Sequence, residues 1–128
     1  MQPSKYSFDE VRDTVMKHVT ERGWHKDNVP RGVAISLSLE ANELLEHYQW
    51  HDEPVGSVEE LADELADVMI YGIQFANWYN IDISDAVMKK LEKSAKKYPV
   101  EAFQSEDPEE RKKAWLDAKK NFKKDTTL

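Results

Sequence analysis

The chain has 128 residues, which suits one domain, and its 40% hydrophobic and 34% charged residues favour a helical globular protein. The absence of cysteine excludes disulfides, thiolate catalysis and zinc–thiolate sites. A net charge of −7 argues against a general nucleic-acid or anionic-membrane binder, although a divalent metal would let an acidic site hold a phosphate. No apolar run approaches the roughly 20 residues of a membrane span, and the N-terminus lacks a signal-peptide pattern. We therefore expect a cytoplasmic protein.

The first half of the chain predicts two helices. Ser7 and Glu10 have the spacing of a capping box, which predicts a helix that ends near residues 22–23, where glycine is a natural terminator. The polar segment 24–30 is predicted to be a loop. A second helix is expected over about residues 30–50, because proline is tolerated in a first helical turn and leucines follow at helical spacing.

The second half predicts three more helices. After a turn at residues 51–56, which contain proline and glycine, Ser57 opens a second capping box and a helix that fades near residues 79–80. Ser84 is expected to cap a fourth helix, which a Tyr-Pro pair ends, and a polar fifth helix is expected over residues 108–122.

No strand or internal repeat is predicted, so the fold class is all-α. We expect an antiparallel four-helix bundle with an extra C-terminal helix. The chain is predicted to be a single domain over residues 1–128, with a core at about 7–100 and a C-terminal extension at 101–128.

Two pairs of carboxylates carry the predicted chemistry. Glu40 and Glu43 are three residues apart on the second helix, and Glu64 and Asp67 are three apart on the third, so each pair shares a helix face. Each pair adjoins an apolar stripe, where carboxylates are costly unless they are paired or bind a cation. Two neighbouring antiparallel helices would bring the four carboxylates together. Oxygen-only ligation with room for water and phosphate is what magnesium prefers.

The spacing of these carboxylates has other interpretations. In so charged a chain, such spacings also arise by chance on solvent-facing helices. A di-iron bundle would need Glu-x-x-His pairs, but His47 follows Glu43 by four residues and the third helix has no histidine. A non-catalytic helical module that oligomerises or binds a partner protein stays open. The face of the first pair continues through His47 to Trp50 at the end of the helix. Packing against the protein and stacking on a base are the alternatives for this tryptophan, and its place on the carboxylate face favours stacking.

Two consecutive runs resemble a known family. They are LEANELLEHYQW, at residues 39–50, and ELADELADVMIY, at residues 60–71, and a Lys-Tyr-Pro follows. Together they resemble the MazG-like all-α nucleoside triphosphate pyrophosphohydrolases, and within them the dCTP pyrophosphatase type, over roughly residues 8–100. The resemblance implies cleavage of a nucleoside triphosphate between the α- and β-phosphates. The products would be a monophosphate and pyrophosphate, a house-cleaning activity on the nucleotide pool.

The resemblance also implies roles for individual residues. Glu40, Glu43, Glu64 and Asp67 match the family's catalytic ligands for Mg²⁺, with Mn²⁺ as a substitute. The residues that match substrate-binding positions are Trp24, Asn28, Trp50, Tyr71, Lys90, Lys97 and Tyr98. Lys90, Lys97 and Tyr98 would lie near the phosphates.

Three departures concern the nucleotide. Asn28 and Ser94 stand where the family often has histidine and asparagine, and Val15 stands where the dCTP-specific relatives can carry a histidine. These departures leave the base preference open, with dCTP or a modified nucleotide as the expected substrates. The family forms dimers or dimers of dimers, so a homodimer or homotetramer is expected. No nucleic-acid or membrane partner is expected.

Overall fold

The computed structural model describes residues 1–125, with side chains up to Phe122, and within these residues the chain forms helices and no strand. Its elements are α1 (Phe8–Glu21), η1 (Trp24–Lys26), α2 (Pro30–Glu46), α3 (Val58–Trp78), α4 (Ile83–Lys97), η2 (Val100–Phe103) and α5 (Pro108–Asp125). The predicted all-α class is confirmed. The chain divides into two compact units, Met1–Ile83 and Ser84–Leu128, which are described separately. The single-domain organisation and the four-helix bundle stay predictions.

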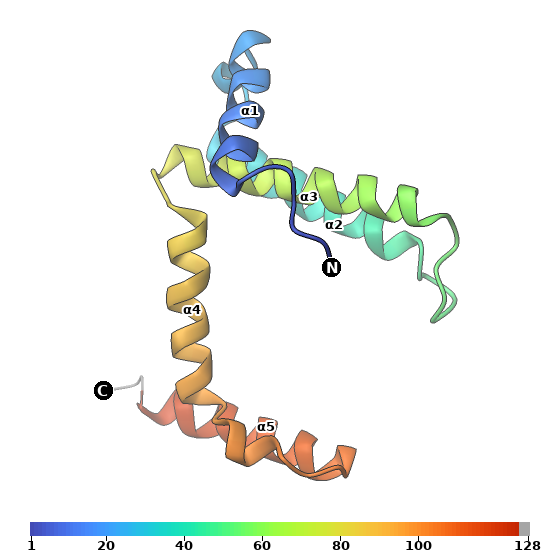
Figure 1. Cartoon of the computed structure of the whole chain (residues 1–128), viewed down its shortest axis with the longest axis vertical. Coiled ribbons are helices and arrows are strands. Elements are labelled where there is room, and N and C mark those ends of the chain that lie inside the picture. Colours follow the sequence, from blue (N-terminus) through green and yellow to red (C-terminus); the bar gives the residue numbers. More distant parts are fainter. Residues whose placement is uncertain (126–128) are drawn as a thin grey trace. The chain divides into compact units, whose positions relative to one another are not determined.

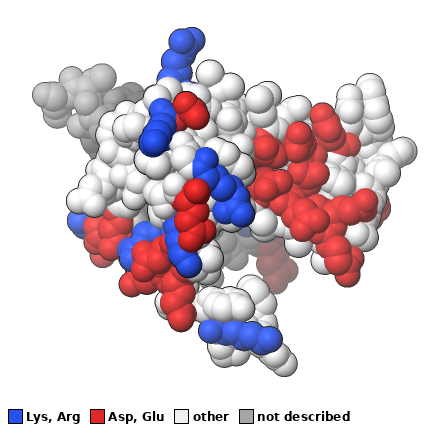
Figure 2. Space-filling model, turned by 90° about the horizontal axis from the view of Figure 1, so that it is seen from above, with Lys and Arg blue, Asp and Glu red and all other residues white. Residues whose placement is uncertain are grey.

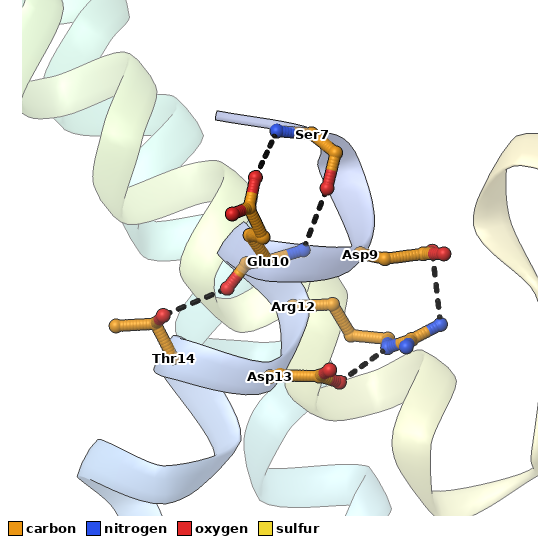
Figure 3. Close-up of polar contacts among 6 residues, drawn as sticks. All are labelled: Ser7, Asp9, Glu10, Arg12, Asp13 and Thr14. Carbon is orange, nitrogen blue, oxygen red and sulfur yellow. Dashed lines mark hydrogen bonds and ion pairs between the residues drawn. The ribbon is translucent and has the colours of Figure 1, made fainter. Parts of the chain in front are cut away.

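The predicted capping box starts α1. Ser7 Oγ accepts a hydrogen bond from the backbone N–H of Glu10, and the carboxylate of Glu10 accepts one from the N–H of Ser7 (Figure 3). Arg12 then reaches both Asp9, at 3.2 Å, and Asp13, at 2.9 Å, on the same exposed surface. The two reciprocal bonds satisfy N–H groups that have no partner inside the helix, so they fix where α1 begins.

The helices α2 and α3 form an antiparallel hairpin, with the two helices side by side (Figure 1). Helix α1 packs on α3 within the same unit. The fully buried side chains of this unit are Val19 on α1, Val33 on α2 and Ile73 on α3. The core therefore lies where the N-terminal part of α2 meets the C-terminal part of α3. The other end of the hairpin carries the carboxylates.

The second helix ends earlier than predicted. We expected it to reach Trp50, but α2 ends at Glu46. The following N–H groups of His47 and Tyr48 donate to carbonyls three residues back, at 3.3 and 2.9 Å, so the last turn tightens. His47 then pairs with Val55 across the loop, which turns the chain toward α3. The cause is this non-local pairing, which the helical spacing of the sequence does not reveal.

The remaining differences are local. Residues 24–26, predicted as loop, form the short helix η1 after Gly23, whose φ of 71° lies in the left-handed region. Ser84 is the second residue of α4 rather than the residue that precedes it, and α5 continues to Asp125 instead of ending at Phe122. In the second unit, α5 packs on η2.

Within the part of the chain described, no helix is both long enough and apolar enough to cross a bilayer. The cytoplasmic location stays a prediction.

Candidate metal and nucleotide site

Three carboxylates meet where α2 faces α3. Each of Glu40, Glu43 and Glu64 offers an oxygen, and these atoms lie within 4.8 Å of one another. Asp67, one turn further along α3, is near enough that its charge acts on Glu40. Figure 2 shows acidic side chains gathered over this hairpin. The structure thus brings the two predicted pairs together, three of the four within reach of a single cation.

The carboxyl group of Glu40 is the electrostatic centre of this cluster. Burial contributes most to raising its pKa above the ordinary value of 4.5, followed by its hydrogen bond to Glu43 and by the charges of Glu43, Asp67 and Glu64. Each of these causes disfavours the ionised form of the Glu40 carboxyl. A cation bound among the oxygens would favour the ionised form instead. We refer to Glu40, Glu43, Glu64 and Asp67 as the acidic cluster.

The cluster lies in a stretch of chain without basic counter-charges. Residues 32–88, which span nearly all of α2, the loop and the whole of α3, contain no Lys or Arg. No Lys or Arg of these residues therefore balances the charge of the cluster, and the basic side chain that contacts it is a histidine, His47. An all-oxygen donor set of this kind fits Mg²⁺ or Mn²⁺ and does not fit a soft metal. Glu40, Glu43, Glu64 and Asp67 are the residues that would hold it.

A histidine contacts the edge of the cluster. Nε2 of His47 lies 3.6 Å from Oε1 of Glu64, and Nδ1 lies 2.6 Å from the carbonyl oxygen of Val55. The bond to Val55 is the main cause that raises the pKa of His47 above 6.5, and the bond to Glu64 and the charges of Glu64 and Glu60 add to it, while burial opposes them. The sequence placed His47 on this helix face but gave no sign of its contact with Val55, which depends on how the loop folds back.

The two aromatic candidates near the cluster differ in their surroundings. Trp50 lies in the loop after α2 and is 81% exposed, so it is not on the carboxylate face of the helix as predicted. A broad hollow opens beside it, lined by residues 48–55. Tyr71 is half-buried on α3, one turn beyond Asp67. An exposed indole at the rim of a hollow has a free face for stacking.

The two candidates before α2 contact different helices, Asn28 on α3 and Trp24 on α1. Asn28 donates a hydrogen bond from Nδ2 to Oε1 of the buried Gln74, at 2.8 Å, and its carbonyl accepts one from Nε1 of Trp78, at 2.7 Å. These residues line a hollow of about 250 Å³. Trp24 packs edge-on against His18, with centroids 5.6 Å apart. Gln74 is not among the site residues predicted from the sequence. Its amide between Ile73 and Phe75, in a mostly apolar part of the third helix, was the available signal.

The remaining candidates lie in the second unit. Lys90 and Lys97 are on α4, and Tyr98 follows it. The ammonium of Lys97 lies 5.2 Å from the ring centre of Tyr98 and 4.7 Å from that of Phe122. These contacts hold Lys97 against aromatic faces within its own unit. The expected proximity of these three residues to the phosphates stays a prediction.

Comparisons with known proteins bear on this site. Residues 35–111, which include all of the acidic cluster, match the MazG-like family. The chain belongs to the MazG-like family. It is 30% identical to human dCTP pyrophosphatase 1 over 117 residues, which is 80% of this chain and 69% of that protein. It is 28% identical to the mouse dCTP pyrophosphatase 1 over 73% of this chain and 60% of the mouse protein.

A solved structure matches as well. A pyrophosphatase from Archaeoglobus fulgidus is similar with a TM-score of 0.64 and 31% identity, over 77% of this chain and 98% of that one. The predicted resemblance to MazG-like proteins of the dCTP pyrophosphatase type is confirmed. The match spans about 60% of the length of the mouse, bovine and rat relatives.

Proposed function

We propose that this protein is a magnesium-dependent nucleoside triphosphate pyrophosphohydrolase. The observation that carries the proposal is the meeting of Glu40, Glu43 and Glu64 within 4.8 Å, in a stretch, residues 32–88, that contains no Lys or Arg. Membership of the MazG-like family and the printed names of its relatives, dCTP pyrophosphatase 1 and a pyrophosphatase, support the same reaction class. The reaction is hydrolysis between the α- and β-phosphates, which gives a monophosphate and pyrophosphate.

The acidic cluster supplies the chemistry in this proposal. The four carboxylates would hold Mg²⁺, which would supply the positive charge that neutralises the triphosphate and acidifies a water. One of these carboxylates or a neighbouring one would accept the proton of the attacking water as general base. Lys90 and Lys97 are proposed to stabilise the charge on the leaving pyrophosphate.

Aromatic and amide side chains are proposed to contact the nucleotide, Trp50 from the loop end of the hairpin and Asn28 from its opposite end. Trp50 offers a free indole face, and Tyr71 lies one turn beyond the cluster. Asn28 adds amide groups that match the donors and acceptors on the edge of a base, and Trp24 lies on the same connection before α2. The relatives named dCTP pyrophosphatase 1 make dCTP and 5-substituted dCTP the first substrates to test.

The protein is also proposed to act as a homodimer or homotetramer. Several large apolar side chains of the hairpin are exposed within its own unit, among them Leu39 at 60%, Leu65 at 54% and Met69 at 44%. Apolar surface of this kind on two adjoining helices is typical of an interface. Light scattering at micromolar concentration tests the assembly, and a monomer would contradict it.

The reaction is tested with a panel of canonical and 5-substituted nucleoside triphosphates, with and without Mg²⁺. The Glu43→Gln variant removes one charge from the cluster. Glu46→Gln makes the same change one turn further along α2, at an exposed residue outside the cluster. We expect Mg²⁺-dependent release of pyrophosphate that Glu43→Gln abolishes and Glu46→Gln retains. If no triphosphate is turned over, the alternative, a non-catalytic oligomerisation or binding module, takes precedence.

A further inference from the structure

His47 and Val55 form a double link that closes the loop between α2 and α3. The backbone N–H of Val55 donates to the carbonyl of His47 at 2.8 Å, and Nδ1 of the His47 ring lies 2.6 Å from the carbonyl of Val55. Because a carbonyl oxygen only accepts, Nδ1 carries the proton in this contact. The enclosed residues 48–54 include Trp50. The loop that carries this tryptophan is therefore fastened at its base by one histidine.

The other side of the ring faces the acidic cluster. Nε2 lies 3.6 Å from Oε1 of Glu64, and the two side chains are only 15% and 25% exposed. The hydrogen bond from Nδ1 to the carbonyl of Val55 fixes the orientation of the His47 ring. In this orientation Nε2 points toward Glu64. One ring thus contacts both the loop that carries Trp50 and a residue proposed to hold the metal.

The chain packs tightly around this ring. Gly56 has a φ of 131°, which L side chains rarely adopt. A Cβ at this position would lie 3.0 Å from Nδ1 of His47 and 2.7 Å from Oε2 of Glu60. That carboxylate in turn accepts the N–H of Ser57 in the capping box of α3. The ring is therefore confined between the loop and the start of α3, in contact with Glu64.

We propose that His47 is a positioning residue that couples metal binding at the acidic cluster to the order of the loop that carries Trp50. The inference rests on the proposed function. When a cation draws Glu64 into a fixed position, the ring is fixed with it, and so is the base of the loop through Val55. The coupling is reciprocal: an ordered loop strengthens metal binding by the same factor as the metal strengthens the order of the loop.

Two variants separate the contacts. His47→Phe keeps a ring of similar shape but removes both polar contacts. His47→Asn retains an N–H close to the position of Nδ1, which can still donate to Val55, but loses the contact with Glu64. His51→Phe is the matched control, because it removes another histidine of the same loop that makes neither contact. Circular dichroism checks that each variant is folded.

The coupling is measured in the full chain without nucleotide. Calorimetry with Mg²⁺ gives the metal affinity, and hydrogen exchange of residues 48–56 with and without Mg²⁺ gives the order of the loop. For the unaltered chain we expect Mg²⁺ to slow exchange in the loop, most directly at the amide of Val55. His47→Phe is expected to weaken Mg²⁺ affinity about 10-fold and to abolish the slowing, whereas His51→Phe retains both. In His47→Asn the loop stays protected without Mg²⁺, but its exchange no longer responds to the metal.

The outcomes separate this proposal from the proposed function. If Mg²⁺ binds and His47→Phe changes neither the affinity nor the response of the loop, the coupling is overturned while the metal site stands. If the unaltered chain binds no Mg²⁺, both proposals fail. Gly56→Ala tests the coupling if His47→Phe does not fold, because the added Cβ displaces the intact His47 ring. This variant is expected to weaken the effect of Mg²⁺ on exchange in the loop. An unchanged effect would contradict the coupling. Excess Mg²⁺ should restore turnover in His47→Phe, which would not happen if the residue only supported the fold.

Discussion

Asn28 donates a hydrogen bond from Nδ2 to Oε1 of Gln74, at 2.8 Å, across 46 residues of sequence. Gln74 is only 4% exposed, and Trp78, one turn further along α3, binds the carbonyl of the same asparagine. The segment before α2 is thus joined to α3 by two directed bonds. This relationship fixes Asn28 at the hollow that it lines with Gln74 and Trp78, at the end of the hairpin opposite to Trp50.

Gln74→Leu is expected to destabilise the protein. The substitution keeps an apolar body at the site but leaves Nδ2 of Asn28 without its acceptor, which costs about 1–3 kcal/mol in the free energy of unfolding. Urea unfolding followed by circular dichroism measures this difference. Gln49→Leu, at an exposed loop residue, is the control and should stay within about 0.5 kcal/mol. Equal effects for the two variants would contradict the role of this bond.

The stability of the metal-free protein is expected to fall as the pH rises from 4.5. Because the pKa of Glu40 is raised in the folded chain, the folded state binds more protons than the unfolded state between 4.5 and that raised pKa. Its contribution is greatest below this window and is lost as the pH passes through it. His47 acts in the same direction above pH 6.5, because its pKa is also raised.

This pH dependence is measured as the Tm in the presence of a chelator. Glu40→Gln should flatten the part of the profile just above pH 4.5, since an amide does not titrate. Mg²⁺ should raise the Tm most at the higher pH values, where the carboxylates are ionised and available as ligands. A profile identical in Glu40→Gln and the unaltered chain would show that this carboxyl does not carry the shift.

Ser57 and Ser84 were both predicted to cap a helix, but only Ser57 precedes its helix in the structure. Ser57 accepts the N–H of Glu60 at 3.2 Å and begins α3, which carries Glu64 and Asp67. Ser57→Ala should therefore cost about 1 kcal/mol in the free energy of unfolding. Ser84 lies inside α4, so Ser84→Ala should be close to neutral. Chemical unfolding measures the free energy of unfolding of both variants. A larger loss of stability for Ser84→Ala than for Ser57→Ala would contradict this assignment and indicate that Ser84 caps α4.

Trp50 is expected to contribute to nucleotide binding and not to folding. Its indole is 81% exposed, so Trp50→Ala should change stability by less than about 0.5 kcal/mol. Loss of base stacking costs about 1–3 kcal/mol, which corresponds to a rise in KM of roughly 5- to 150-fold. Steady-state kinetics give the KM, and Trp115→Ala, in the second unit, is the comparison. An unchanged KM would remove Trp50 from the proposed site.

Much of this architecture could be predicted from local patterns. The capping boxes at Ser7 and Ser57 fixed the starts of α1 and α3, because both partners of each box lie within four residues. The spacing of Glu40 and Glu43 likewise placed them on one face of α2. These features depend on neighbours in sequence, so the chain itself reveals them.

The parts that were missed depend on contacts between distant residues. The end of α2 at Glu46 follows from the pairing of His47 with Val55, eight residues on, and helical spacing continues past this point. Gln74 is meaningful only once Asn28 is placed against it. No periodicity encodes either contact, which is why Trp50 was assigned to a helix that ends before it.

The central claim is hydrolysis between the α- and β-phosphates at the acidic cluster. Phosphorus NMR of dCTP incubated with the protein and Mg²⁺ tests it most directly, with Glu43→Gln and Glu46→Gln measured alongside. We predict signals of dCMP and pyrophosphate alone, for the unaltered protein and for Glu46→Gln, and unreacted dCTP for Glu43→Gln. The appearance of dCDP with inorganic phosphate, or the same products from Glu43→Gln at an unchanged rate, would contradict the account.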